Sequence, residues 1–217
     1  MPTPQRSSCI HIEALPLSDG RLYTGETMYQ RPHGVGSALY DDGSGYSGEW
    51  KNGLECGQGK ITSHAIEYTG EMRNGRAEGV GLIVDENGSY HGMVCNLKPH
   101  GVGIMHWPNG NSYEGDWEHG MMEGEGLMME HQWIMYKGTY RHNMRDGRGL
   151  VFARNGPVFA GMWNTNKRHG RGKEIDTDGT IFCGKWLDNE RHGRGGTRHP
   201  DGSVVRSQWV RGQEVVQ

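Results

Sequence analysis

The sequence has few of the residues that cross-link a chain or anchor it in a membrane. It contains 8 prolines and 4 cysteines in 217 residues, and no apolar run approaches the roughly 20 residues that span a bilayer. Residues 1–20 carry neither a signal-peptide pattern nor a lipidation motif. The cysteines are too scattered for a disulfide framework or a zinc site. We therefore expect a cytoplasmic protein with no metal and no other cofactor.

Apolar residues are also scarce, at 33% of the chain, whereas glycine occurs 37 times. Glycine usually makes up roughly 7% of a protein, so a thick aliphatic core is not expected here. The glycines lack the three-residue period of collagen. Seven tryptophans and nine tyrosines are too many for a flexible glycine-rich linker. The composition instead directs attention to an internal repeat.

An aromatic residue followed two positions later by glycine recurs every 22 or 23 residues. We number each repeat from this aromatic residue, as position 0. A Gly-x-Gly begins at position +11 in every repeat, and positions +4 are mostly aromatic as well. The aromatic residues at position 0 are Tyr23, Tyr46, Tyr68, Tyr90, Tyr113, Tyr136, Phe159 and Phe182.

Each repeat has the pattern of a β-hairpin. Positions 0, +2 and +4 share one face of a strand, because side chains alternate with a period of two. Turn pairs such as Asn52-Gly53 and Asp42-Gly43 separate the alternating segments. With +4 opposite +11, glycine +2 faces glycine +13, and the rings lie over bare backbone. The predicted fold class is all-β: an elongated, single-layer, twisted antiparallel sheet of tandem β-hairpins.

The repeat pattern also predicts how the chain is divided. Residues 1–17 form an N-terminal extension with a capping strand, residues 18–203 hold eight repeats, and residues 204–217 form a C-terminal capping strand and tail. The segment 10–17 resembles the second half of a hairpin. The segment 204–210, a degenerate ninth repeat, resembles a first strand whose partner is missing. Both segments are predicted sheet edges.

These residues resemble the MORN-repeat family, whose units of roughly 23 residues read Tyr-x-Gly-x-Trp and then Arg/His-Gly-x-Gly. Tyr46-Ser-Gly-Glu-Trp50 and Tyr113-Glu-Gly-Asp-Trp117 match the first part, and His169-Gly-Arg-Gly172 matches the second. The resemblance covers about residues 18–210. It implies a hairpin array that acts as an adaptor, often as a homodimer and often on cytoskeleton, cilia or membranes.

Charge is distributed unevenly along the chain. Residues 1–135 carry 8 Lys+Arg and 18 Asp+Glu, net −10, whereas residues 136–217 carry 15 and 8, net +7. The last three full repeats have arginine at +12, between the two glycines, and again at +9. These two columns form the candidate anion- or partner-binding residues: Arg145, Arg148, Arg168, Arg171, Arg191 and Arg194. The alternative is that they are solvated strand residues whose stems cover the rings.

The sequence favours no enzyme and no nucleic-acid binder. The histidines before Gly-x-Gly form a repeat-defined column, and no nucleophile, base and oxyanion donors can be grouped. The overall negative charge argues against nucleic acid. Two hypotheses remain. One is a scaffold for an unidentified protein partner, including an antiparallel homodimer, at cytoskeletal, ciliary or flagellar structures. The other is a membrane module in which the arginine columns bind anionic phospholipid.

Overall fold

The computed structural model describes residues 9–130 and 134–215, and these form strands joined by turns, without a helix. The chain divides into two compact units, Met1–Gly103 and Ile104–Gln217, with the boundary inside β9. The first nine strands are β1 (Ile10–Pro16), β2 (Leu22–Met28), β3 (Arg31–Leu39), β4 (Gly45–Lys51), β5 (Leu54–Thr62), β6 (Ile66–Arg73), β7 (Arg76–Asp85), β8 (Gly88–Cys95) and β9 (Lys98–His106). The next ten are β10 (Ser112–Glu118), β11 (Met121–Glu130), β12 (Ile134–Arg141), β13 (Met144–Ala153), β14 (Val158–Asn164), β15 (Lys167–Ile175), β16 (Ile181–Leu187), β17 (Glu190–Arg198), β18 (Val204–Val210) and β19 (Gln213–Val215).

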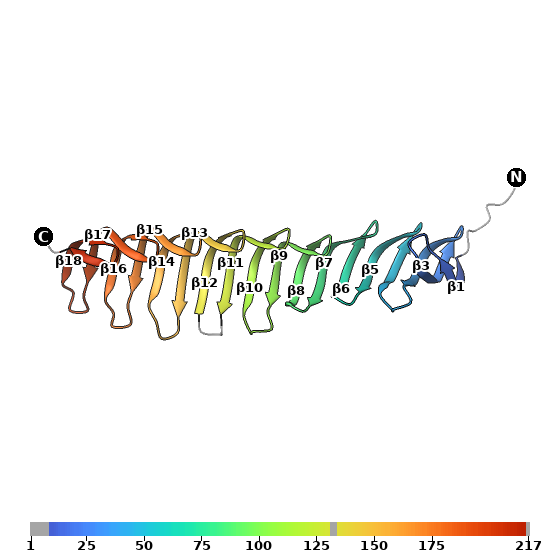
Figure 1. The fold of residues 1–217 in the computed structure, drawn as a ribbon, viewed down its shortest axis with the longest axis horizontal. Helices are drawn as coiled ribbons and strands as arrows, with labels where there is room; N and C mark the ends of the chain where they lie inside the picture. Colours follow the sequence, from blue (N-terminus) through green and yellow to red (C-terminus); the bar gives the residue numbers. More distant parts are fainter. Residues whose placement is uncertain (1–8, 131–133, 216–217) are drawn as a thin grey trace. The chain divides into compact units, whose positions relative to one another are not determined.

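Within each unit the described strands pair antiparallel with their neighbours in the sequence (Figure 1). Two strands make up one repeat, as in β4 with β5 or β14 with β15. The next repeat then continues the same sheet, as β3 with β4 and β15 with β16 show. The predicted fold class, an all-β single layer of tandem antiparallel hairpins, is therefore confirmed within each unit.

The hairpin register is partly as predicted. Gly48 faces Gly59, so positions +2 and +13 do meet across the strands. Trp50, however, faces Glu55, which means that +4 opposes +9 and not +11. The predicted pairing of +4 with +11 inside a hairpin is wrong because a tight turn sets the register: Asn52 and Gly53 both have positive φ, at 54° and 88°.

A β-bulge lies between the pair formed by +2 and +13 and the pair formed by +4 and +9. Between β6 and β7 the pairing shifts from Met72↔Ala77 to Gly70↔Gly81, so Glu71 alone spans residues 78–80 of the partner strand. The first glycine of each Gly-x-Gly lies in this bulge with positive φ, for example 59° at Gly57, a conformation that favours glycine. The residue at +3 lies against that glycine: a Cβ on Gly57 would lie 2.4 Å from Cδ of Glu49, whereas one on Gly193 would lie 3.5 Å from Cδ of Lys185.

The core of each unit is one layer of rings on glycine, as predicted. A Cβ on Gly36 would lie 2.5 Å from Cε2 of Tyr23, so only glycine fits beneath that ring. Each +4 ring stands edge-on between two position-0 rings: Trp50 lies 5.2 Å from Tyr23 and 5.3 Å from Tyr46, between centroids. The position-0 rings are buried, and burial raises the pKa of Tyr68 to about 12.

The two ends of the sheet differ from each other. At the N-terminal end, β1 pairs with β2 through an irregular register in which Ala14 has φ 63°, so this edge is interrupted by a bulge. At the C-terminal end, β18 pairs with the short strand β19 through Gln208↔Val215 and Val210↔Gln213. The prediction that residues 204–210 lack a partner strand is therefore wrong. The sequence signal was weak because β19 has only three residues.

Candidate functional site: a glycine-floored trough with an arginine column

The two predicted arginine columns lie on opposite faces of the sheet in the C-terminal unit. The column at +9 lies on the ring face and is half-buried. The guanidinium carbon of Arg168 lies 4.2 Å from the ring centroid of Trp186 and 5.4 Å from that of Phe159. Arg145 and Arg191 stack on rings in the same way. These three arginines therefore stabilise the ring layer by cation–π contacts.

A buried carboxylate ties two of these arginines together. Glu174 is 8% exposed and accepts hydrogen bonds from Arg168, at 2.5 Å, and from Arg191, at 2.8 Å. Ile61 and Ile83 occupy the same position in earlier repeats, opposite the position-0 ring. The +9 column thus packs on the ring layer through its guanidinium groups, which differs from the alternative of solvated arginines whose stems cover the rings.

The column at +12 has a different environment. Arg148, Arg171 and Arg194 are exposed on the face opposite the rings, and within the described residues none of them has a side-chain hydrogen bond or an ion pair. Successive members are two strands apart, about 10 Å along the sheet. Only this column therefore presents free guanidinium groups to a ligand.

The surface between these arginines is hollow along the rows of repeat glycines. We call this surface the glycine trough. Three adjoining hollows of about 690, 490 and 750 Å³ follow one another along it. The first and second share Ala160 and Arg171, and the second and third share Cys183 and Arg194. The floor consists of the paired repeat glycines Gly138, Gly149, Gly161, Gly172, Gly184 and Gly195.

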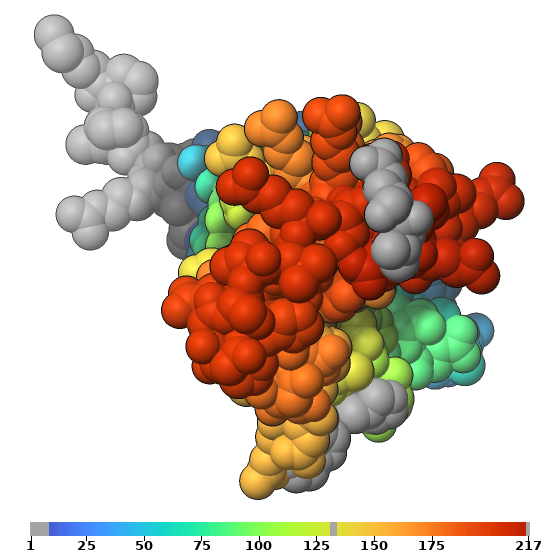
Figure 2. Space-filling view, turned by 90° about the vertical axis from the view of Figure 1, so that its left-hand side faces the viewer, coloured from blue at the N-terminus to red at the C-terminus, as the bar shows by residue number. Residues whose placement is uncertain are grey.

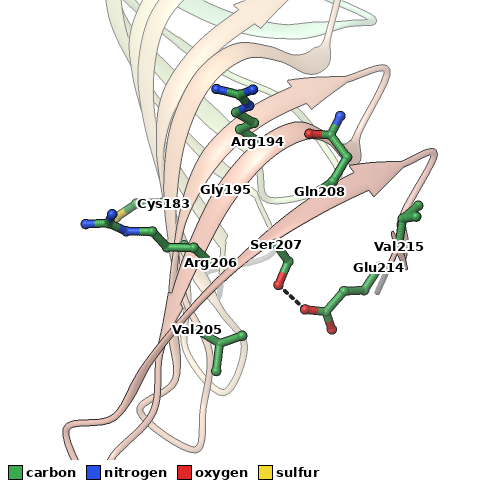
Figure 3. A pocket seen from close by; sticks show the side chains of 10 residues that line it. Cys183, Arg194, Gly195, Val205, Arg206, Ser207, Gln208, Glu214 and Val215 are labelled. Carbon is green, nitrogen blue, oxygen red and sulfur yellow. Dashed lines mark hydrogen bonds between the residues drawn. The ribbon is translucent and has the colours of Figure 1, made fainter. Parts of the chain in front are cut away.

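The third hollow lies at the C-terminal end of this unit (Figure 3). Arg206 and Cys183 lie on one side of it in that view and Glu214 on the other. Ser207 donates a hydrogen bond to the Glu214 carboxylate, so this carboxylate already has a partner. Figure 2 looks onto the same end, where the last strands of the unit form the surface.

The middle hollow has the most one-sided charge. Arg171, Lys173, Lys185 and Arg194 line it, together with small residues only, and no carboxylate lines it. The first hollow includes Glu125 and the third includes Glu214. The trough is therefore most suited to an anion at its centre.

The sequence reasoning missed the lysines of this hollow. Lys173 and Lys185 stand at +14 and +3, outside the aromatic and glycine positions that define the repeat. A comparison of the +3 residue across repeats would have found the signal, because this residue changes from glutamate in the first three repeats to lysine in the last.

Other chemistry is not assembled in the described part of the chain. No group of three or more His, Cys, Asp or Glu residues comes together there in a way that could hold a metal ion. The same residues include no helix with the length and apolar character needed to cross a bilayer.

Comparison with solved structures finds chains of low sequence identity. A Drosophila melanogaster structure described as the SAS-4 (dCPAP) TCP domain in complex with a proline-rich motif of Ana2 (dSTIL) is 13% identical. That alignment covers 96% of each chain with a TM-score of 0.27. A streptogramin B lyase structure is 12% identical over 94% of this chain and 84% of the other, with a TM-score of 0.15. Among curated proteins nothing matches.

Comparison with protein families finds a match over most of the chain. The MORN repeat matches seven segments: residues 46–64, 68–90, 98–112, 113–129, 136–156, 159–181 and 182–204. These segments cover more than half of the chain and coincide with the hairpins described above. The family consists of repeat modules suited to interaction and is generally non-enzymatic. The chain therefore belongs to the MORN-repeat family.

Proposed function

We propose that this chain is a non-enzymatic cytoplasmic scaffold that binds a protein partner along the glycine trough, at cytoskeletal or ciliary and flagellar structures. The observation that carries the proposal is the division of the arginines. The +9 column stacks on rings in the core, whereas Arg148, Arg171 and Arg194 stand exposed over bare backbone. A row of unpaired guanidinium groups on a hollow floor favours an acidic protein surface.

The test replaces the exposed column and follows where the full-length protein goes. In ciliated cells, the tagged wild-type chain should fractionate with the detergent-insoluble cytoskeleton, and the Arg148→Ser/Arg171→Ser/Arg194→Ser variant should move to the soluble fraction. A control with Arg141, Arg198 and Arg211 changed to Ser removes the same charge from exposed positions outside the trough hollows. If the trough variant stays with the cytoskeleton, the proposal fails.

A homodimer is a specific form of this proposal. Because residues 1–135 carry net −10 and residues 136–217 net +7, an antiparallel pair would bring unlike charges together. Light scattering of the purified chain at low and high salt measures its mass directly. A dimer that dissociates as salt increases supports this arrangement, and a monomer at every concentration and salt excludes it.

Anionic phospholipid is the second candidate ligand, because basic residues near a charged bilayer contribute about 1 kcal/mol each. The structure leaves three arginines of the two columns exposed for this purpose, since the other three stack on rings. We therefore rank lipid below protein. Flotation with phosphatidylserine vesicles that retains the wild type and releases the trough variant would reverse this order.

A further inference from the structure

In two repeats the bulge presents a backbone amide that binds a carboxylate of this chain. In the second repeat the amide of Gln58, at +12, donates a hydrogen bond to Oε1 of Glu49, at 2.8 Å. In the fifth repeat the amide of Glu125 donates to Oδ2 of Asp116, at 2.9 Å. The carboxylate comes from +3 in both cases. The bulge is thus a small anion site that the chain fills from within.

The last two full repeats keep the bulge and lack the carboxylate. Gly170 and Gly193 both have φ 67°, as the bulge requires. The residue at +3 is Met162 in one repeat and Lys185 in the other. Among the described residues no side chain accepts a hydrogen bond from the amide of Arg171 or of Arg194. Arg171 and Arg194 line the middle hollow, and their amides lack the carboxylate that the second and fifth repeats supply.

The side chains around these two amides are positively charged, which favours the binding of an external anion. The guanidinium groups of Arg171 and Arg194 and the ammonium groups of Lys173 and Lys185 line one hollow of about 490 Å³ with no carboxylate. The other residues that line this hollow are small: Ala160, Gly172, Cys183 and Gly184. A carboxylate there would accept hydrogen bonds both from a backbone amide and from charged side chains. Such charge-assisted hydrogen bonds are stronger than neutral ones.

We propose that the bulge amides of Arg171 and Arg194 each bind a carboxylate from an acidic segment of a protein partner, with the two carboxylates about 10 Å apart, the spacing of two strands. This inference rests on the proposed protein-binding function and specifies which groups recognise the partner. The occupant is an acidic protein segment because the ligands that occupy this site elsewhere in the chain are Glu and Asp side chains. A side chain also reaches a floor amide between Arg171 and Arg194 more readily than the plane of a bilayer does.

The experiment restores the internal carboxylate. Met162→Glu places at the Arg171 bulge the group that Glu49 supplies in the second repeat. The probe is a fluorescent glutamate-rich peptide, measured by anisotropy with the full chain at low ionic strength. We expect peptide affinity to fall about tenfold, since a charge-assisted hydrogen bond is lost to an internal competitor. The melting temperature should rise.

Two matched variants separate amide binding from net charge. Ala160→Glu adds the same charge on the same strand and in the first hollow, which Met162 also lines, at +1, which does not face the bulge. It should weaken peptide binding by about threefold or less, because its charge is solvated. Met93→Glu restores the carboxylate at +3 in the N-terminal unit, outside the trough, so it should raise the melting temperature and leave peptide binding unchanged.

The outcomes distinguish this inference from the function on which it rests. If Met162→Glu and Ala160→Glu weaken the peptide equally while Arg148→Ser/Arg171→Ser/Arg194→Ser abolishes binding, the trough binds acidic segments and the amide inference is wrong. If the arginine variant binds the peptide as well as the wild type, both are wrong. Binding of phosphatidylserine vesicles with no binding of the peptide overturns the protein partner in favour of lipid.

Discussion

In the N-terminal unit the residue that faces the bulge is glutamate in three repeats and methionine in the fourth, whereas in the C-terminal unit it is aspartate, threonine, methionine and lysine in turn. The backbone is the same in both, with glycine facing glycine and a positive φ at the bulge. The difference shows that the repeat separates two tasks. The aromatic and glycine positions specify the sheet, and the +3 position supplies a carboxylate to the bulge amide in the second and fifth repeats and none in the last two.

The ring face shows a parallel difference. Tyr68 donates its hydroxyl to the carbonyl of Glu71 at 2.7 Å, and the other tyrosines at position 0 make the equivalent bond to the carbonyl at +3. Phe159 and Phe182 have no hydroxyl, and their repeats instead place Arg168 and Arg191 over the rings, joined by Glu174. The last two full repeats thus lack this local hydrogen bond and have an ionic network between them.

The largest effect should come from the scaffold that the two units share. Gly172→Ala places a Cβ about 2.5 Å from Cε2 of Phe159, and Gly59→Ala makes the same collision with Tyr46. We expect each to lower the free energy of unfolding by about 3 kcal/mol, measured by urea titration, because ring and backbone must separate. The control is Gly196→Ala, whose Cβ meets nothing closer than 3.8 Å. A tolerated Gly172→Ala with a damaging Gly59→Ala would show that the two units are not built on one principle.

Removal of the buried carboxylate should have the next largest effect, confined to the C-terminal unit. Glu174→Ala leaves Arg168 and Arg191 half-buried without their shared partner, and we expect a loss of about 2 kcal/mol. Glu174→Ile supplies the residue that Ile61 and Ile83 provide at this position, so it should recover most of the stability through apolar contact with the ring. Equal losses in the two variants would mean that the ion pair, and not the filling of this position, stabilises these repeats.

The structural features that the sequence predicts correctly are those that local interactions determine. The period of two and the Asn-Gly turns predict hairpins, and the glycine pairs predict the rings above them. The bulge was missed because its evidence is the conformation of Gly57 and the side chain of Glu49, which a residue pattern does not show. The two arginine columns were treated in the sequence as one candidate set, although a three-residue step along a strand already places +9 and +12 on opposite faces.

Single substitutions can test that division of the arginines. Arg168→Ser removes the cation from Trp186 and Phe159 and the donor from Glu174, so a loss of about 1.5 kcal/mol is expected by urea titration. Arg171→Ser, three residues further along the same strand, changes an exposed side chain and should shift stability by less than about 0.5 kcal/mol. The reverse ranking would place the functional column on the ring face and would remove the basis of the proposed site.

The smallest effect concerns the ring hydroxyls and appears most clearly in alkali. Burial raises the pKa of Tyr68 to about 12, against an ordinary value near 10. Between these values the unfolded chain loses the hydroxyl proton while the folded chain keeps it, so stability is complete below pH 10 and falls as pH rises toward 12. Tyr68→Phe should cost about 1 kcal/mol at pH 7, through the lost bond to Glu71, and should make the alkaline decline shallower.

The reciprocal change sharpens the comparison between the units. Phe159→Tyr gives a C-terminal repeat the hydroxyl that the repeats of the N-terminal unit carry, so its alkaline decline should become steeper than that of the wild type. Urea titrations at pH 7, 10 and 11 measure all three proteins. An unchanged slope in both variants would show that alkali acts through the surface charges of the chain, because a buried ring hydroxyl that titrates on unfolding must alter that slope.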